Sequence, residues 1–320
     1  MHKQNQLPDN VKIGKFIDPL TDYGFKLLFG SEPNKDLLIS FLNVLFKNRK
    51  EIIDLTYNKN ERNGPQRDYR KAVYDLTCTG KDGEQFIIEV QRLHQPYFKD
   101  RALYYTSLLI HDQAPKGKEW DYSLKEVYFS AIMDFSFEDT HPKKYFHRIH
   151  LTDEESGEIF YDKMALIFLE IPKFNKREKS LKTDLDRWLF VLKNMSRLEK
   201  IPLILRKQIF EKVFNIAEVS NLTKEDYMNY ERDLMAYWDD YAIKKSLEHD
   251  RRIAMEKGME KGMEKGMEKG MEKGMEKGME KAKTESVKNL LKTGKFSISE
   301  ISNYISVSEA FVRKVKKNLT

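Results

Sequence analysis

The apolar positions in the first part of the chain follow two different periods. Phe25, Leu28 and Phe29 lie at i, i+3 and i+4, which predicts one apolar face of a short helix that ends at Gly30. Further helices are expected at residues 34–46 and 97–113. Runs rich in β-branched and aromatic residues predict strands. These strands are expected at residues 52–57, 71–79, 84–91, 126–135, 145–151 and 164–171.

The pattern becomes helical in the second part of the chain. Residues 126–135 (EVYFSAIMDF) are almost continuously apolar, which is typical of a central strand covered on both faces. From about Ser180 the apolar residues return to helix spacing, and further helices are expected at 202–219 and 223–248. The Thr-Lys-Glu-Asp sequence that starts at Thr223 resembles a helix N-terminus.

Residues 75–91 (DLTCTGKDGEQFIIEVQ) predict a β-hairpin. Two strand-forming runs flank Lys-Asp-Gly at 81–83, and a three-residue hairpin loop places its glycine in the left-handed region. With this loop Asp75 faces Glu89, and Gln91 shares their face because side chains two residues apart point the same way. A two-residue loop would send Asp75 and Glu89 to opposite faces, so the register is a hypothesis. The other face would carry Leu76, Cys78, Ile88 and Val90, which suit a core.

Two carboxylates side by side on one face need an explanation. Like charges directly opposite each other destabilise a sheet. A divalent cation would remove the conflict, since Mg²⁺ takes one or two protein carboxylates and keeps water or phosphate oxygens at its other positions. A solvated outer face that carries two acids by chance is the alternative.

Four stretches of the chain, in a fixed order, carry a family resemblance. They are residues 22–30 (DYGFKLLFG), residues 37–43 (LLISFLN), the trio Asp75, Glu89 and Gln91, and the trio Phe98, Arg101 and Tyr105. In this order they resemble the Rpn family, the recombination-promoting nucleases and transposases of the PD-(D/E)XK nuclease superfamily. The resemblance covers roughly the first 135 residues.

The resemblance implies an α/β fold of the restriction-endonuclease type, with a mixed sheet flanked by helices. It implies a Mg²⁺ ion (or Mn²⁺ or Ca²⁺) on Asp75, Glu89 and the Val90 carbonyl. Gln91 would orient water or phosphate, and Asp22 would be an auxiliary acid beside the metal. The third residue of the superfamily motif is usually Lys, so the uncharged Gln91 leaves the role of that lysine in polarising water without an assigned residue.

Basic side chains near this site are candidate DNA contacts. Lys26 is a candidate phosphate contact, although it shares a helix face with Asp22, and a surface ion pair worth about 0.2–0.5 kcal/mol is the alternative. Arg101 is a candidate to hold a catalytic carboxylate or a phosphate, because its planar fork suits either, and a generic salt bridge is the alternative. The polar loop at 59–70 either lies over DNA or is an ordinary loop.

Residues 255–278 are six copies of Met-Glu-Lys-Gly, followed by Met-Glu-Lys-Ala. Met, Glu and Lys favour helix, but each Gly costs about 1 kcal/mol relative to Ala. A period of four drifts by about 40° per repeat against the helix period, so no straight apolar seam forms and a heptad coiled coil is not expected. The repeat is therefore expected to be a marginal helix or a flexible spacer, and a helical oligomerisation element is the functional alternative.

The last 38 residues hold most of the basic surplus. Residues 283–320 contain eight Lys or Arg against three Glu, a net charge of +5 out of +6 for the whole chain. Two sequences resemble capping boxes, one starting at Ser297 and one at Ser306. Three short helices are expected to form a helix-turn-helix-like unit. Its last helix would present Arg313, Lys314 and Lys317 to DNA, and a solvated tail or a small helical adaptor is the alternative.

Four regions are expected from these patterns. They are a nuclease domain at 1–175, a helical region at 176–250, a repeat spacer at 251–282 and a basic helical tail at 283–320. No apolar run approaches 18 residues and no apolar signal region occurs at the start, so a cytoplasmic protein with no membrane partner is expected. The single cysteine, Cys78, excludes an intramolecular disulfide and a cysteine-based zinc site.

The function expected from these residues and the resemblance is metal-dependent hydrolysis of DNA by an endonuclease that promotes recombination or belongs to a mobile element. DNA is the expected partner, and a homo-oligomer is a further option. One alternative is a nuclease fold that binds or assembles on DNA without cleaving it, which the missing lysine favours. A second alternative is a structural protein whose repeat and tail mediate assembly.

Overall fold

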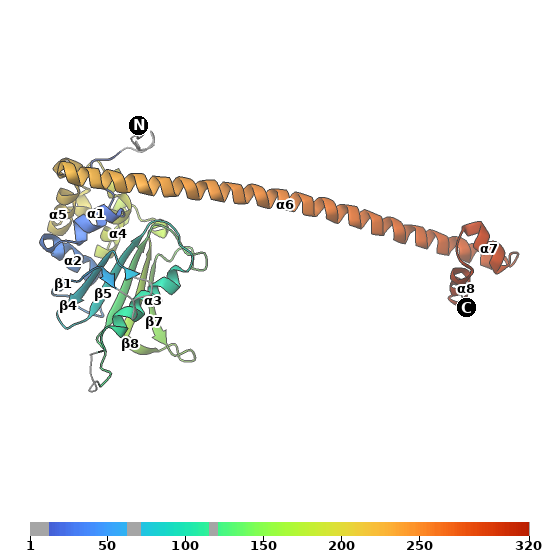
Figure 1. Cartoon of the computed structure of the whole chain (residues 1–320), viewed down its shortest axis with the longest axis horizontal. Coiled ribbons are helices and arrows are strands. Elements are labelled where there is room, and N and C mark those ends of the chain that lie inside the picture. Colours follow the sequence, from blue (N-terminus) through green and yellow to red (C-terminus); the bar gives the residue numbers. More distant parts are fainter. Residues whose placement is uncertain (1–12, 63–71, 115–120, 320) are drawn as a thin grey trace. The chain divides into compact units, whose positions relative to one another are not determined.

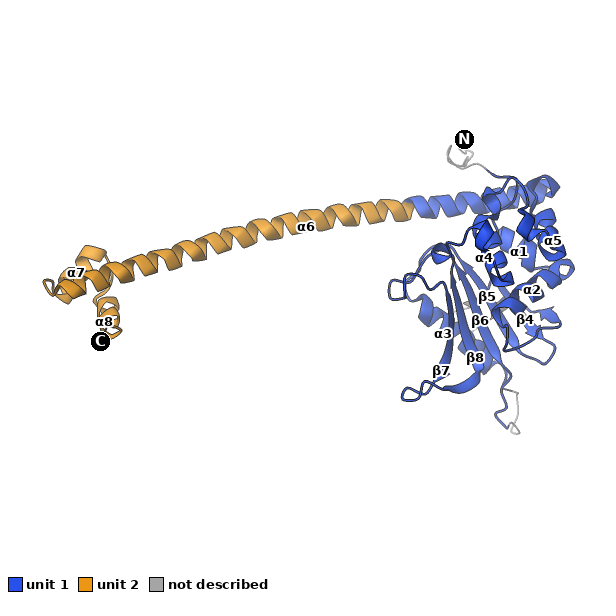
Figure 2. Ribbon diagram, turned by 180° about the vertical axis from the view of Figure 1, so that it is seen from behind, with its two compact units in different colours: residues 1–242 blue, residues 243–320 orange. Residues whose placement is uncertain are grey.

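The computed structural model describes residues 13–62, 72–114 and 121–319. Most of the polar loop at 59–70 lies outside these residues. The described chain divides into two compact units, residues 1–242 and 243–320, which Figure 2 shows in different colours. Within the described ranges, no helix combines the length and the apolar content that a membrane crossing requires.

The first unit is built on a mixed six-stranded sheet (Figure 1). In spatial order the strands are β1 (Leu55–Tyr57), β4 (Leu76–Gly80), β5 (Gln85–Gln91), β6 (Val127–Met133), β8 (Ile159–Glu170) and β7 (Phe146–Thr152). The three inner strands β5, β6 and β8 run parallel, and the remaining pairs are antiparallel. Two further short strands, β2 (Glu61–Arg62) and β3 (Ala72–Val73), pair with each other.

Strand β6 lies between two parallel neighbours, and all seven of its residues are buried. The nearly continuous apolar run at 126–135 therefore forms a central strand covered on both faces, as expected.

Helices cover both faces of this sheet. One face carries α1 (Asp22–Phe29), α2 (Lys35–Leu45), α4 (Asp184–Asn194) and α5 (Gln208–Ala217), and the other carries α3 (Phe98–His111). Short 3₁₀ turns are Glu32–Asn34, Ile171–Lys173, Glu178–Ser180, Met195–Arg197, Leu203–Leu205 and Val219–Asn221. The expected fold class, a mixed sheet flanked by helices and followed by a long helical region, is confirmed.

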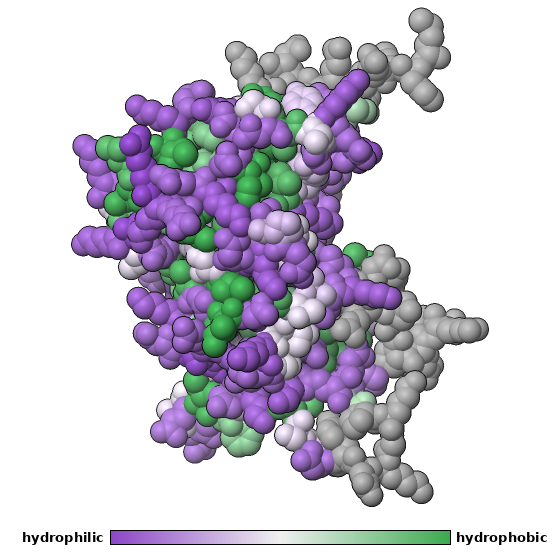
Figure 3. Space-filling view, turned by 90° about the vertical axis from the view of Figure 1, so that its left-hand side faces the viewer, coloured by the Kyte–Doolittle hydropathy of each residue, from purple (hydrophilic) through white to green (hydrophobic). Residues whose placement is uncertain are grey.

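The helices after residue 176 share the core of the sheet. The buried ring of Trp188 on α4 lies 5.6 Å from those of Phe29 and Phe41 and 5.0 Å from that of Phe210, measured between ring centroids. One hydrophobic cluster thus joins α1, α2, α4 and α5 to the strands. The outer surface that Figure 3 shows is mostly hydrophilic, with apolar groups in scattered patches.

Thr21 caps the start of helix α1: its hydroxyl accepts a hydrogen bond from the Gly24 backbone N–H at 3.0 Å. Asp22 is therefore the first helical residue, and its carboxylate is not used for capping.

The hairpin has the expected register. Leu76 pairs with Ile88 and Thr79 with Gln85, so continuation by one residue sets Asp75 opposite Glu89. Gly83 has φ +87°, the left-handed conformation that the three-residue loop requires. Leu76, Cys78 and Ile88 lie in the larger hydrophobic cluster, with Val90 packed against it.

The long helix α6 (Lys224–Thr293) contains the whole repeat. Thr223 caps its start by accepting a hydrogen bond from the Asp226 backbone N–H at 3.1 Å, as the sequence indicates. Of the two states expected for the repeat, the structure shows the helix, and its methionines are exposed to solvent. The helix ends before Gly294, whose φ is +69°.

The second unit ends in α7 (Ile298–Ile305) and α8 (Glu309–Lys317), which pack with the end of α6 around Val287, Ile301, Val312 and Val315. The expected capping box at Ser297 is present. The second one is wrong: Ser306 adopts the left-handed conformation at the end of α7, and Ser308 caps α8 instead. The reason is that the turn between the helices takes up two more residues than the expected cap allows.

Candidate active site

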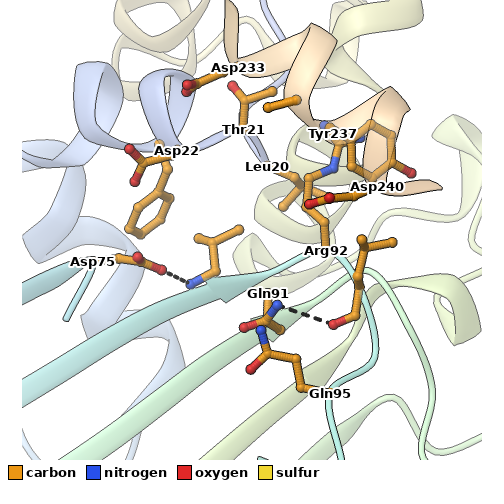
Figure 4. Close-up of a pocket in the computed structure, with 14 residues that line it drawn as sticks. Leu20, Thr21, Asp22, Asp75, Gln91, Arg92, Gln95, Asp233, Tyr237 and Asp240 are labelled. Carbon is orange, nitrogen blue, oxygen red and sulfur yellow. Dashed lines mark hydrogen bonds between the residues drawn. The ribbon is translucent and has the colours of Figure 1, made fainter. Parts of the chain in front are cut away.

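A pocket of about 280 Å³ lies at the carboxyl end of β5, between α1 and the first turns of α6. Figure 4 shows that side chains from these three elements point into it. Asp22 comes from α1, Asp75 and Gln91 come from the hairpin, and Asp233 and Asp240 come from α6. The folded chain therefore brings four of the expected site residues, Asp22, Asp75, Val90 and Gln91, to one pocket, whereas Glu89 is not among the described residues that line it.

Asp75 and Glu89 are held beside each other by the backbone of the hairpin. The Val90 N–H donates to Asp75 Oδ2 at 2.6 Å, and the Asp75 N–H donates to Glu89 Oε1 at 3.3 Å. Glu89 is only 3% exposed. Each carboxylate thus accepts a hydrogen bond from the strand that carries the other, which fixes the pair in position.

Burial and mutual repulsion disfavour two negative charges here. Burial first, and the nearby Asp75 carboxylate second, raise the pKa of Glu89 to about 8. Burial also raises the pKa of Asp75 above its ordinary value, and Asp22 adds to this effect. Burial and mutual repulsion thus favour the neutral forms of both acids, and a further positive charge at the pair would favour their ionised forms.

The donor atoms at this pair fit a hard divalent cation. Carboxylate oxygens and backbone carbonyls are the ligands that Mg²⁺ prefers. The N–H and C=O of one strand residue point to the same neighbour, so the Val90 carbonyl faces the side on which its N–H meets Asp75. In the part of the chain that the structure describes, no cluster of three or more His, Cys, Asp or Glu forms a fuller ligand set. A cation at this pair would therefore have two carboxylates as its acidic ligands, with its other positions left for water or phosphate.

Arg101 on α3 contacts Glu89, one member of this pair. Its Nη2 lies 3.0 Å from Glu89 Oε2 and 3.0 Å from Gln91 Oε1. The sequence left two roles open for Arg101, a carboxylate contact or a phosphate contact. The geometry places it on the carboxylate.

Gln91 has both ends of its amide engaged. Its oxygen accepts from Arg101, and its Nε2 donates to the Leu93 carbonyl at 3.1 Å. The side chain lines the pocket in a fixed orientation.

Lys26 forms the alternative interaction that its spacing allowed. Its Nζ lies 2.7 Å from Asp22 Oδ1, and both side chains are about half exposed. Lys26 thus lies at the surface beside Asp22 and forms an ion pair with it.

The pocket also contains residues that the sequence analysis did not single out. Asp233 Oδ2 accepts from the Tyr23 N–H at 2.6 Å, which fixes α6 to α1. The ring of Tyr237 lies 3.5 Å from the Arg92 guanidinium, which also pairs with Asp18 at 3.0 Å. Only the fold reveals this wall, because no local sequence signal links α6 to β5.

The three expected DNA contacts of the tail are exposed on α8 in the second unit. Arg313 lies 3.4 Å from Glu309 on the same helix, and Lys314 and Lys317 follow in its last turns.

A family model described as "PD-(D/E)XK nuclease family transposase" matches residues 19–246. The chain belongs to this family. Searches of the curated proteins and of the solved structures found no match.

The match confirms the family resemblance drawn from the sequence. The matched segment of this PD-(D/E)XK nuclease transposase begins just before α1 and ends in the first third of α6. It therefore includes every side chain of the pocket, including those from α6. The repeat and the tail lie beyond it.

Proposed function

We propose that this chain is a metal-dependent DNA endonuclease that hydrolyses phosphodiester bonds at the Asp75–Glu89 pair. The observation that carries the proposal is the pairing of Asp75 with the buried Glu89, in which burial and then repulsion from Asp75 raise the pKa of Glu89 to about 8. Repulsion between two adjacent carboxylates lowers the free energy of unfolding, and a bound cation would offset this loss. Membership of a nuclease transposase family supports DNA as the substrate and recombination or transposition as the setting.

In this proposal Asp75, Glu89 and the Val90 carbonyl hold Mg²⁺, with Mn²⁺ or Ca²⁺ as substitutes. When bound, the ion lowers the pKa of a coordinated water and neutralises charge on the phosphate. The chain's own residues do the rest. Asp75 is fixed by the Val90 N–H, Glu89 by Arg101, and Gln91 by Arg101 and Leu93. In hydrolysis, the oxygen of water forms a new bond to phosphorus and gives up one proton to solvent, while the P–O bond to the leaving oxygen breaks and that oxygen takes a proton from solvent.

Asp22 is the proposed auxiliary acid, because it lines the same pocket and faces Asp75 (Figure 4). Lys26 would reach a phosphate only by leaving Asp22. The basic face of α8, with Arg313, Lys314 and Lys317, is proposed to add affinity for DNA without sequence readout. A single buried free cysteine agrees with a cytoplasmic protein.

The alternative is a nuclease fold that binds DNA without cleaving it. The observation that favours it is Gln91, which is uncharged and has both amide ends engaged within the chain.

One assay distinguishes cleavage of DNA from binding without cleavage. Wild type is incubated with supercoiled plasmid in Mg²⁺, Mn²⁺, Ca²⁺ or chelator, beside Asp75→Ala. The nuclease proposal expects nicked or linear plasmid from wild type in Mg²⁺ or Mn²⁺ and none in chelator or from Asp75→Ala. Binding of the plasmid with no cleavage in any cation would establish the alternative.

A further inference from the structure

The third position of the signature carries no charge in this chain. The motif in the family's name ends in the letter K, whereas the chain has Glu89-Val90-Gln91. Four aspartates line the pocket: Asp22, Asp75, Asp233 and Asp240. Phosphodiester hydrolysis increases the negative charge on the phosphate in the transition state, so a positive side chain at the site adds to the stabilisation that the proposed cation gives.

Arg92 does not provide that charge, although it is the one cation among the described residues that line the pocket. Its guanidinium lies 3.0 Å from Asp18 and 3.5 Å from the centre of the Tyr237 ring. Arg92 Nε also lies 3.8 Å from Asp134. These contacts hold Arg92 against Tyr237 of α6 and against Asp18 and Asp134, and not against Glu89.

Arg101 reaches the signature from a different element. One nitrogen, Nη2, contacts both Glu89 and Gln91 at 3.0 Å. The same guanidinium donates to Gln95, which lines the pocket beside Gln91. A guanidinium has only donors, so each amide must turn its oxygen toward Arg101. Arg101 therefore orients two side chains that line the pocket, Gln91 and Gln95, together with the adjacent Glu89, and places a permanent positive charge beside them.

We propose that Arg101 is a positioning residue that supplies, through Glu89 and Gln91, the positive charge that position 91 lacks. The proposal rests on the nuclease function proposed above. It has a specific consequence: a cation placed at position 91 substitutes for the one removed from position 101. A purely structural role for Arg101 has no such consequence, because a lysine at 91 would not refill the space left on α3.

The test uses the full chain and four variants: Arg101→Met, Arg101→Lys, Gln91→Lys, and Arg101→Met combined with Gln91→Lys. Single-turnover cleavage is measured at saturating DNA, and DNA affinity is measured separately in chelator. Lys99→Met is the matched control, because Lys99 lies on the same helix but pairs with Asp139 at 2.6 Å, away from the pocket. Melting temperatures verify folding, and Arg101→Gln replaces Arg101→Met if the latter is unstable.

The expected result is a cleavage rate about 100-fold lower in Arg101→Met. Its DNA affinity stays within about threefold of wild type, and the double variant regains at least about tenfold in rate. Arg101→Lys retains most of the rate and Lys99→Met all of it.

Three outcomes overturn the proposal: a wild-type rate in Arg101→Met, weakened DNA binding with an unchanged rate at saturation, or no recovery in a folded double variant. An inactive wild type beside an active Gln91→Lys also overturns it, because Arg101 then fails to supply the charge. If neither cleaves in any cation, the nuclease function itself fails, and this proposal with it.

Discussion

At the scale of single residues, the hairpin joins two acids in one hydrogen-bond network, and α3 sets a guanidinium beside one of them. Asp75 and Glu89 each accept from the opposite strand, and Arg101 closes the network. The shared position of Asp75, Glu89 and Gln91 could be predicted from the sequence because their spacing and the hairpin turn are local. The partner of Glu89 could not be chosen, because a helical arginine twelve residues later suits a phosphate equally well.

The charge balance at Glu89 predicts how stability depends on pH. Folding raises the pKa of Glu89 from 4.5 to about 8, so Glu89 is mainly neutral in the folded chain at pH values below about 8. Its stabilising contribution is complete below about pH 4.5 and is lost as pH rises through about 8. In chelator, the melting temperature of wild type should fall between pH 6 and 9 by several degrees more than that of Glu89→Gln.

The exposed Glu199→Gln serves as the control and should follow wild type. A divalent cation should restore much of the loss at pH 9 in wild type but not in Glu89→Gln. Parallel pH profiles for wild type and Glu89→Gln would show that Glu89 titrates normally.

At the scale of elements, the hairpin was predictable and the helix caps only in part. The loop length fixes the register, and Gly83 has the positive φ that this loop demands. The cap at Ser297 was predicted correctly, whereas the one at Ser306 was not. Ser306 ends α7 in the left-handed conformation, and Ser308 caps α8. Caps depend on the backbone path between helices, which spacing alone does not determine.

Gly83 gives a direct test of the turn. At φ +87°, a Cβ atom at position 83 strains the backbone. It would not clash with a neighbour, because the nearest atom, on Lys125, lies 3.4 Å away. Gly83→Ala should lower the free energy of unfolding by about 1–2 kcal/mol, and Gly83→Asn by less, because Asn tolerates the left-handed region. Chemical denaturation measures both, and equal stability of all three proteins would argue against this turn.

Replacing glycines of the α6 repeat should have the opposite effect and stabilise the helix. A Cβ on any of its six glycines would meet nothing within 4 Å, and each glycine weakens the helix by about 1 kcal/mol relative to Ala. Replacing Gly262, Gly266, Gly270 and Gly274 by Ala should therefore slow hydrogen exchange of the repeat amides. No change in exchange would mean that the repeat helix is stabilised by something other than its own propensity.

At the scale of the whole molecule, the wall that α6 adds to the pocket was beyond sequence reasoning. Asp233, Tyr237 and Asp240 are distant from β5 in the chain and become neighbours only because α6 is fixed to α1 through Asp233 and to β5 through Arg92. The core that joins α4 and α5 to the sheet was likewise hidden, since helix spacing shows an apolar face but not its partner.

The second unit carries the basic surplus, and this predicts its effect on DNA binding. Changing Arg313, Lys314 and Lys317 together to Gln should weaken DNA binding and reduce the slope of log affinity against log salt by up to about 0.9 for each lost phosphate contact. The cleavage rate at saturating DNA should stay unchanged, because these side chains are not among those that line the pocket. An unaltered salt dependence would exclude α8 from the DNA contact.

The measurement that tests the central claim most directly is the single-turnover cleavage rate of Asp75→Asn in Mg²⁺, beside Asp36→Asn. Asp36 is exposed and pairs with Lys212 at 2.6 Å, so its variant reports the effect of losing an ordinary surface carboxylate. Burial raises the pKa of Asp75, so Asp75→Asn should melt no lower than wild type in chelator. The account predicts a loss of cleavage of about 100-fold or more in Asp75→Asn and none in Asp36→Asn. Cleavage by folded Asp75→Asn at the wild-type rate would contradict it.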